Sequence, residues 1–403
     1  MMRAGNPGDA VRLPGGEADL PEAPYLLLTP GPLTTTKTVK ASMLRDWCTW
    51  DRDYNGLVQS VRERLVELAA PGGAREFTAV LMQGSGTFAV ESAVGTFLPR
   101  EGGKLAVLCN GAYGERIARI AEVLGIELAL LRSEETEPAD AEALARLLEA
   151  DPAITHVAAV HCETTTGMLN PVRDIAAAAK RYGRTVIIDA MSSFGGIPLD
   201  MQELGIDVLV SSSNKCIQGV PGFGFVIARR ELLAGCRGHA RSHALDLFDQ
   251  WETMERHGGK WRFTSPTHVV RAFDQALQEL EAEGGPAARH ARYLESHRTL
   301  VDGMEALGFL PLLPEALRSP FITTFRYPAS AGFDFGEWYL RLKAAGFVIY
   351  PGKLSSADTF RIGTIGEVYP EDMRRLTEAV KRSRFWLEAG ASEEDVPEHS
   401  PVR

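Results

Sequence analysis

Two kinds of segment alternate along most of this chain. Short runs rich in β-branched and other apolar residues are separated by longer amphipathic stretches whose apolar residues recur at helical spacing. The strand-like runs include KLAVLC, THVAAV, TVIIDA and DVLVSS, and the helix-like stretches include ESAVGTF, ERIARIAEVLG, AEALARLLEA and PVRDIAAAAKRYG. Strands joined through helices pair in parallel, so the pattern predicts an α/β domain with helices on both faces of a sheet. The run FGFVIA follows DVLVSS with no room for a crossover helix and is predicted to be antiparallel.

The chain is predicted to contain two folded units between two flexible ends. Residues 1–24 and 391–403 are rich in Gly, Pro and acidic residues without apolar periodicity, which is typical of flexible segments. A large domain is predicted over residues 25–270. A smaller α+β domain is predicted over residues 271–390, with strands at FITTFRY, GFVIY and TFRIG and helices at FGEWYLRLKAAG and PEDMRRLTEAVKRSRFWLEA.

The charge balance narrows the class of partner. The formal net charge is −10 and the pI is about 5.5, which argues against nucleic acid or an anionic membrane as the main partner. We find neither a signal peptide nor an apolar run long enough to span a bilayer. The five cysteines show no C-x-x-C spacing, which favours reduced thiols in a cytoplasmic protein over a disulfide framework or a zinc site.

Three features follow strand-like runs and fall on one predicted edge of the sheet. Gly84, Ser85 and Gly86 lead into a helix after TAVLM, Asp189 ends TVIID, and Lys215 follows DVLVSS. Each alone has an ordinary explanation, namely a turn, a cap and a solvated lysine. Together they are what pyridoxal phosphate requires: a helix N-terminus for the phosphate, a carboxylate for the pyridine nitrogen and a lysine to form an imine.

An ordered series of motifs extends this interpretation over roughly residues 25–388. The series comprises YLLLTPGPLTTTKTV, CTWDRDYN, LMQGSGTFAVE, NGAYGERI, HCETTTGMLNP, DAMSSFGGIPLD, NKCIQGVPGFGFVIAR, GKWRFTSPTHVV, GFVIYPGK and DTFRIGTIGEV. The chain resembles the class V aminotransferases of pyridoxal-phosphate fold type I, and Asn214 before the lysine matches their phosphonate-specific branch. The resemblance implies a mostly parallel seven-stranded sheet and a homodimer with shared active sites. It also implies transfer of an amino group from 2-aminoethylphosphonate to pyruvate.

The resemblance also implies a set of site residues. Lys215 and Asp189 are the predicted catalytic residues, and Arg361 is predicted to bind the substrate anion, with Arg262 and Arg241 as the next candidates. The ring of Tyr113 is predicted to stack on the cofactor. Thr264 is predicted to reach the phosphate in the partner subunit, with a helix N-cap as its alternative. The predicted cofactor-binding residues are Ser85, Gly86, Thr87, Tyr113, Thr164, Asp189, Asn214, Lys215 and Thr264. Thr165 or Thr166 could take the place of Thr164.

Some residues differ from those usual in the phosphonate branch. These are Ser213, His243, Phe248 and Thr364, of which Thr364 is expected to bear most on the choice of phosphonate because it lies close to Arg361 in sequence. The alternatives are an alanine or serine:glyoxylate aminotransferase, a lyase or hydrolase of the same fold, and a Rossmann-type nucleotide-binding protein. Against the last, GSGTFA lacks the G-x-G-x-x-G pattern and no acidic residue ends a second strand at the expected distance.

Overall fold

The computed structural model describes residues 23–330, 332–354 and 357–387. The tail predicted over residues 391–403 lies outside the described residues, as does the extension predicted over residues 1–24 except for its last two positions.

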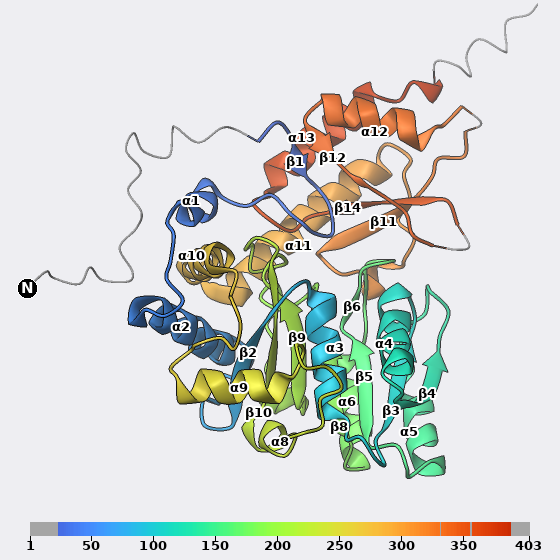
Figure 1. The fold of residues 1–403 in the computed structure, drawn as a ribbon. Coiled ribbons are helices and arrows are strands. Elements are labelled where there is room, and N and C mark those ends of the chain that lie inside the picture. Colours follow the sequence, from blue (N-terminus) through green and yellow to red (C-terminus); the bar gives the residue numbers. More distant parts are fainter. Residues whose placement is uncertain (1–22, 331, 355–356, 388–403) are drawn as a thin grey trace, which may run out of the picture.

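A seven-stranded sheet forms the centre of the larger unit (Figure 1). In spatial order its strands are β2 (Phe77–Gln83), β10 (Phe223–Arg229), β9 (Val208–Ser212), β8 (Thr185–Asp189), β5 (His156–Val160), β3 (Lys104–Cys109) and β4 (Glu127–Arg132). Only β10 runs antiparallel to its neighbours, β2 and β9. The predicted fold class, a mostly parallel seven-stranded sheet, is confirmed, and the antiparallel FGFVIA strand is confirmed with it. Strand β4 was not among the quoted strand-like runs, because its place at the sheet edge leaves it only half buried.

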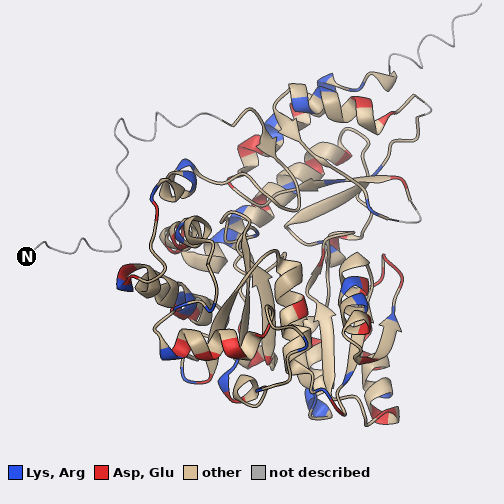
Figure 2. Cartoon of the chain, in the orientation of Figure 1, with Lys and Arg blue, Asp and Glu red and all other residues tan. Residues whose placement is uncertain are grey.

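Helices cover both faces of this sheet (Figure 1). The helices of the larger unit are α1 (Lys37–Ala41), which packs on α10 and not on the sheet, α2 (Arg52–Ala69), α3 (Gly86–Phe97), α4 (Ala112–Val123), α5 (Ala141–Ala150), α6 (Val172–Arg181), α7 (Met201–Leu204), α8 (Arg230–Ala234), α9 (Leu247–Arg256) and α10 (Thr267–Glu283). Helix α3 contacts α4 and α9, whereas α6 contacts α5 and α7. Figure 2 shows the charged residues mainly on the helices and loops around the sheet, as expected for strands buried on both faces.

The smaller unit has an antiparallel sheet of β11 (Ile322–Arg326), β14 (Thr359–Gly363) and β13 (Tyr350–Pro351), in that order. Its helices are α11 (Gly285–Glu305), α12 (Phe335–Ala344) and α13 (Pro370–Arg382). A dense aromatic core joins them, in which Trp338 lies 4.9 Å from Phe360 and 5.3 Å from Phe309 between ring centroids. Aromatic pairs in such clusters stabilise a fold by more than their buried area alone accounts for.

Two elements cross the limits predicted from the sequence. Strand β1 (Leu26–Leu27) pairs in parallel with β12 (Phe347–Val348), and Leu28 lies in the aromatic core of the smaller unit. Helix α10 extends past residue 270, and its buried Phe273 and Leu277 pack in the core of the larger unit. By packing, therefore, Leu26–Leu28 belong to the smaller unit, and the chain returns to that unit after α10. In the part of the chain that the structure describes, no helix is long and apolar enough to cross a membrane.

Candidate active site

A cavity of about 160 Å³ lies where β2, β8 and β9 end. Its lining includes seven of the nine residues predicted to bind the cofactor: Ser85, Gly86, Thr87, Tyr113, Asp189, Asn214 and Lys215. Four separate segments of the chain contribute them, as expected when ligands bind at the carboxyl ends of parallel strands. The remaining lining residues are Val90, Arg116, Ile117, Met191 and Ser212.

Lys215 follows β9 and turns its amine toward the loop after β1. Its Nζ donates to the carbonyl oxygen of Pro30 at 2.5 Å. Gly31 approaches so closely that a Cβ there would lie 2.8 Å from Nζ, and its φ of +117° is one that only glycine adopts readily. Burial lowers the pKa of Lys215 from its ordinary value, which raises the fraction of neutral amine at neutral pH. A neutral amine is the form that attacks a carbonyl carbon.

Asp189 is the last residue of β8 and is buried at the cavity wall. Burial raises its pKa to about 6, and the nearby Glu163 acts in the same direction. The N–H of Met191 donates to Oδ1 at 2.8 Å and opposes the shift, as do the charges of Arg116 and Lys215. A buried carboxyl in this state would be stabilised as an anion by a positively charged donor in the cavity, such as a protonated ring nitrogen.

The N-terminus of α3 forms the opposite side of the cavity. Ser85 is the N-cap residue, yet its side chain makes no capping hydrogen bond. A Cβ on Gly86 would lie 2.3 Å from the sulfur of Met191, so a side chain there would have to displace the thioether that lines the cavity. The hydroxyl of Thr87 accepts from Nη1 of Arg116 at 3.2 Å. Free N–H groups, hydroxyls and a guanidinium together suit an anion with several acceptor oxygens, such as a phosphate.

Tyr113 is held in place through the start of α4. Its backbone N–H donates to Oε2 of Glu163 at 3.2 Å, so that a carboxylate from β6 (Cys162–Glu163) caps the helix. A Cβ on Gly111 would lie 2.4 Å from the carboxyl carbon of Glu163, which leaves no space for a side chain there. Burial raises the pKa of Tyr113, so its phenol is neutral and the ring presents an apolar face.

The three consecutive threonines of HCETTTG have different environments. Thr164 shares a hydrogen bond of 2.9 Å with Ser192, and its side chain is close enough to the phenol of Tyr113 to lower the pKa of that phenol. The hydroxyls of Thr165 and Thr166 instead donate to Glu163. Of the three, Thr164 is therefore the one linked to the cavity wall, in agreement with the choice made from the resemblance; its role toward the cofactor stays a prediction.

Arg361 lies on β14, beside the cavity rather than in its lining. Its Nε donates to the carbonyl oxygen of Pro351 at 3.1 Å, and its Nη1 donates to that of Thr164 at 3.0 Å. The side chain is only 4% exposed, and burial lowers its pKa. Both bonds fix the plane of the guanidinium, which leaves Nη2 and the second N–H of Nη1 to meet an anion.

The two arginines that were the next candidates for the anion site bond to backbone carbonyls outside the cavity. Arg241 donates to the carbonyl oxygens of Leu98 at 2.8 Å and Pro99 at 3.0 Å. Arg262 donates to the carbonyl oxygen of His243 at 3.1 Å. Neither lines the cavity that contains Lys215.

Thr264 and Thr364 lie outside the cavity, and the role of Thr264 toward the partner subunit stays a prediction. Thr264 is exposed and does not line the cavity, and the N-cap of α10 is Pro266, so the alternative role of Thr264 as a helix cap is wrong. Thr364 is fully buried and donates to the carbonyl oxygen of Pro320 at 2.5 Å. Because that bond holds the hydroxyl within the smaller unit, Thr364 is poorly placed to select a substrate.

Sequence reasoning missed Arg116 as part of the cavity. Its guanidinium carbon lies 4.7 Å from the ring centroid of Tyr113, three positions earlier on α4. Residues three apart share a helix face, so the spacing within YGER could have identified Arg116 once Tyr113 was assigned. The loop carbonyl of Pro30 was also missed, and no local signal connects it to Lys215.

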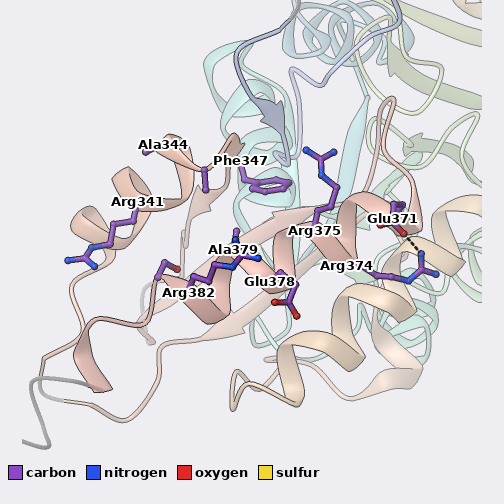
Figure 3. Close-up of a pocket in the computed structure, with 11 residues that line it drawn as sticks. Arg341, Ala344, Phe347, Glu371, Arg374, Arg375, Glu378, Ala379 and Arg382 are labelled. Atoms are coloured by element: carbon purple, nitrogen blue, oxygen red, sulfur yellow. Dashed lines mark hydrogen bonds and ion pairs between the residues drawn. The ribbon is translucent and has the colours of Figure 1, made fainter.

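A larger groove lies elsewhere, between α12 and α13 (Figure 3). Its volume is about 770 Å³, and its lining includes four arginines, of which Arg374 pairs with Glu371 at 2.7 Å and Arg375 with Asp372 at 3.1 Å. None of the predicted site residues lines it. Size alone therefore does not locate the active site in this chain.

Comparison with known proteins places the chain in a family. A family model described as Aminotransferase class-V matches residues 59–344. A curated protein of Syntrophobacter fumaroxidans, named 2-aminoethylphosphonate--pyruvate transaminase, is 65% identical over 90% of this chain and 96% of its own length. A protein of the same name from Vibrio cholerae is 59% identical over 91% of this chain and 99% of its own length.

Solved structures share the fold at low sequence identity. Pyridoxamine-pyruvate aminotransferase from Mesorhizobium loti is 23% identical, with a TM-score of 0.81 over 92% of this chain and 93% of its own. Ureidoglycine-glyoxylate aminotransferase from Bacillus subtilis is also 23% identical, with a TM-score of 0.82 over 92% of this chain and 96% of its own. Together with the family model and the curated relatives, these likenesses confirm the resemblance noted in the sequence: the chain belongs to the class-V aminotransferase family.

Proposed function

We propose that this enzyme uses pyridoxal 5'-phosphate to move the amino group of 2-aminoethylphosphonate to pyruvate, with phosphonoacetaldehyde and L-alanine as products. The observation that carries the proposal is the position of Lys215 and Asp189 in one cavity with the N-terminus of α3. The donor set fits the cofactor because it combines a partly neutral amine, a buried carboxyl and a cluster of anion-binding groups. Relatives at 57–65% identity, all named for this reaction, support the choice of substrates.

When bound, the cofactor supplies a carbonyl that accepts the amino group and a ring that delocalises the electrons left when the substrate C–H bond breaks. Lys215 provides the movable base. Its Nζ accepts the proton from the substrate carbon that bears nitrogen and delivers it to the acceptor carbon as an acid. Because burial lowers the pKa of Lys215, its neutral amine forms more readily than that of a solvated lysine.

The surrounding residues orient the reactants. Asp189 keeps a positive charge at the ring nitrogen, the N-terminus of α3 with Ser85 and Thr87 holds the phosphate, and Tyr113 supports one face of the ring. Arg361 orients the substrate anion, which is a phosphonate in one half-reaction and a carboxylate in the other. The same guanidinium serves both because each anion presents paired oxygens.

A second copy of the chain is part of this proposal. Phe88 and Phe263 are 49% and 51% exposed and line an apolar cavity of about 480 Å³ next to Gly84, at the start of α3. Exposed aromatic surface of this kind favours an interface. In a homodimer, Thr264 beside Phe263 would approach the phosphate site of the partner. Light scattering should give twice the chain mass, and Thr264→Ala should weaken cofactor binding; a monomer with full cofactor affinity would contradict the shared site.

The test of the reaction is product analysis. Purified enzyme, loaded with pyridoxal phosphate, is given 2-aminoethylphosphonate and pyruvate, and alanine and phosphonoacetaldehyde are quantified. Parallel reactions replace the donor with alanine or serine and the acceptor with glyoxylate. The amino acid formed from the acceptor is the readout, namely alanine from pyruvate and glycine from glyoxylate. Alanine formed from the phosphonate donor faster than either product forms from the other donors supports the proposal; a preference for serine or alanine with glyoxylate contradicts it. The cytoplasmic location expected from the cysteine content stays a prediction.

A further inference from the structure

Three positive side chains surround Tyr113 on the cavity wall. The guanidinium carbon of Arg116 lies 4.7 Å from the ring centroid, and Nζ of Lys353 lies 5.5 Å from it. Arg361 is close enough for its charge to lower the pKa of the Tyr113 phenol, and its Nη1 donates to the backbone carbonyl of Thr164 at 3.0 Å. Positive charge is therefore concentrated around the ring of Tyr113.

The three positive side chains lie at two ends of the site. Arg116 bonds to Thr87 at the start of α3, the end assigned to the cofactor phosphate. Arg361 belongs to the smaller unit, at the end assigned to the substrate anion. Lys353 is on the same hairpin as Arg361: Tyr350 is the register partner of Arg361, and Lys353 follows three residues later.

The hairpin formed by β13 and β14 fixes the position of the backbone that carries Lys353. Nε of Arg361 bonds to the carbonyl of Pro351, and the N–H of Gly352 donates to the carbonyl of Thr359 at 2.8 Å. A Cβ on Gly352 would lie 2.2 Å from the hydroxyl of Thr359, so this close pairing of the two strands depends on glycine. The backbone that carries Lys353 is therefore tied to the strand that carries Arg361.

Lys353 forms no ion pair with an acidic residue in the described ranges, although many exposed basic residues of the chain do. The substrate differs from an ordinary amino acid in its anion, because a phosphonate has a second ionisable oxygen and becomes a dianion as the pH rises, whereas a carboxylate carries a single negative charge. Arg361 alone supplies a single positive charge, with two of its N–H groups already bonded to carbonyls.

Resting on the function proposed above, we propose that Lys353 supplies the second positive charge for the phosphonate and so favours phosphonate over carboxylate ligands in this site. The contact matters in the half-reaction that uses 2-aminoethylphosphonate and little in the one that uses pyruvate. Lys353 is in this view a specificity-determining residue that binds the substrate and takes no part in proton transfer.

The test compares two lysine variants in the holoenzyme. Lys353→Gln removes the charge at the site. Lys343→Gln is the matched control, because Nζ of Lys343 also lies 5.5 Å from a tyrosine ring, that of Tyr25, and Lys343 is on α12 away from the cavity. Calorimetry, at a pH high enough to make methylphosphonate a dianion, measures the binding of methylphosphonate and of acetate, which present the two anions without an amine to react. Single-turnover absorbance then measures each half-reaction.

We expect Lys353→Gln to weaken methylphosphonate binding about ten-fold, a typical effect of losing one charge-assisted contact, and to change acetate binding less than about two-fold. The 2-aminoethylphosphonate half-reaction should show the same loss in its concentration dependence, Lys353→Arg should restore most of it, and Lys343→Gln should behave as the wild type. Equal losses for both anions, or none, would overturn the inference while the proposed function stands. A wild-type enzyme that forms no alanine from 2-aminoethylphosphonate and pyruvate would refute the proposed function and this inference together.

Discussion

Replacement of Arg361 by lysine is the substitution whose effect can be worked out most closely from the structure. The guanidinium spans two carbonyl oxygens, of Pro351 at 3.1 Å and of Thr164 at 3.0 Å, and still has N–H groups to offer an anion. A lysine keeps the charge, but its single ammonium cannot reach both carbonyls and the substrate from one position. The variant therefore gives up either the orientation of the cation or its contact with the anion.

The expected loss is about 1–3 kcal/mol in transition-state stabilisation, the range for one charge-assisted hydrogen bond whose geometry is spoiled. This corresponds to roughly 5- to 150-fold in rate. Both half-reactions should slow, because the phosphonate and the carboxylate use the same guanidinium. Single-turnover absorbance measures them separately, with 2-aminoethylphosphonate added to the pyridoxal form and pyruvate to the pyridoxamine form.

A matched substitution separates the site from general stability. Arg62 is as buried as Arg361, at 3% exposed, and donates to the carbonyl of Ala79 at 2.7 Å, yet it does not line the cavity. Arg62→Lys should lower the melting temperature and leave both half-reactions near the wild-type rate. If Arg361→Lys left both rates intact, the anion would have to bind elsewhere and the reasoning above would be refuted. If only the phosphonate half slowed, the two anions would use separate subsites.

Three further outcomes are expected. Lys215→Ala should abolish multiple turnover while leaving circular dichroism unchanged, because the lysine acts chemically in a polar cavity; near-normal turnover without added amine would exclude its role. Asp189→Asn should slow proton transfer by orders of magnitude and weaken cofactor binding far less, as measured by stopped-flow and equilibrium titration; equal damage to both would make Asp189 a structural cap. Burial lowers the pKa of His156, His161 and His297 to about 4, whereas the unfolded chain binds these protons near pH 6.5. The free energy of unfolding should therefore fall as the pH drops from 6.5 to 4, by on the order of 3 kcal/mol per histidine, and a flat denaturant-derived profile over this window would contradict that assignment.

The features that could be predicted from the sequence are those that depend on local residue pattern and spacing. Continuous apolar runs identified the buried strands, and the missing crossover before FGFVIA identified β10 as antiparallel. Asp189 and Lys215 could be paired because one ends a parallel strand and the other follows the next, and the carboxyl ends of such strands meet at one edge. The helix start at Gly86 was visible because small residues there allow the backbone to approach.

The rest depended on contacts between segments distant in the chain. The bond from Lys215 to Pro30, the pairing of β1 with β12 and the buried hydroxyl of Thr364 leave no local trace in composition or periodicity. Thr364 shows this most clearly, since it is close to Arg361 in sequence, yet its hydroxyl bonds to the Pro320 carbonyl while the Arg361 guanidinium bonds to the carbonyls of Pro351 and Thr164. Along a strand, the direction of a side chain depends on register and on the partner strands.

The most direct test of the central claim is the visible spectrum of the purified enzyme loaded with pyridoxal phosphate, followed by addition of 2-aminoethylphosphonate. The account predicts an absorption band that borohydride abolishes while fixing the pyridoxyl group on Lys215, as located by peptide mass mapping. In the unreduced enzyme, 2-aminoethylphosphonate should shift the band to that of the pyridoxamine form, and pyruvate should restore it. A colourless protein, a label on another lysine, or a band that does not respond to 2-aminoethylphosphonate would contradict the account.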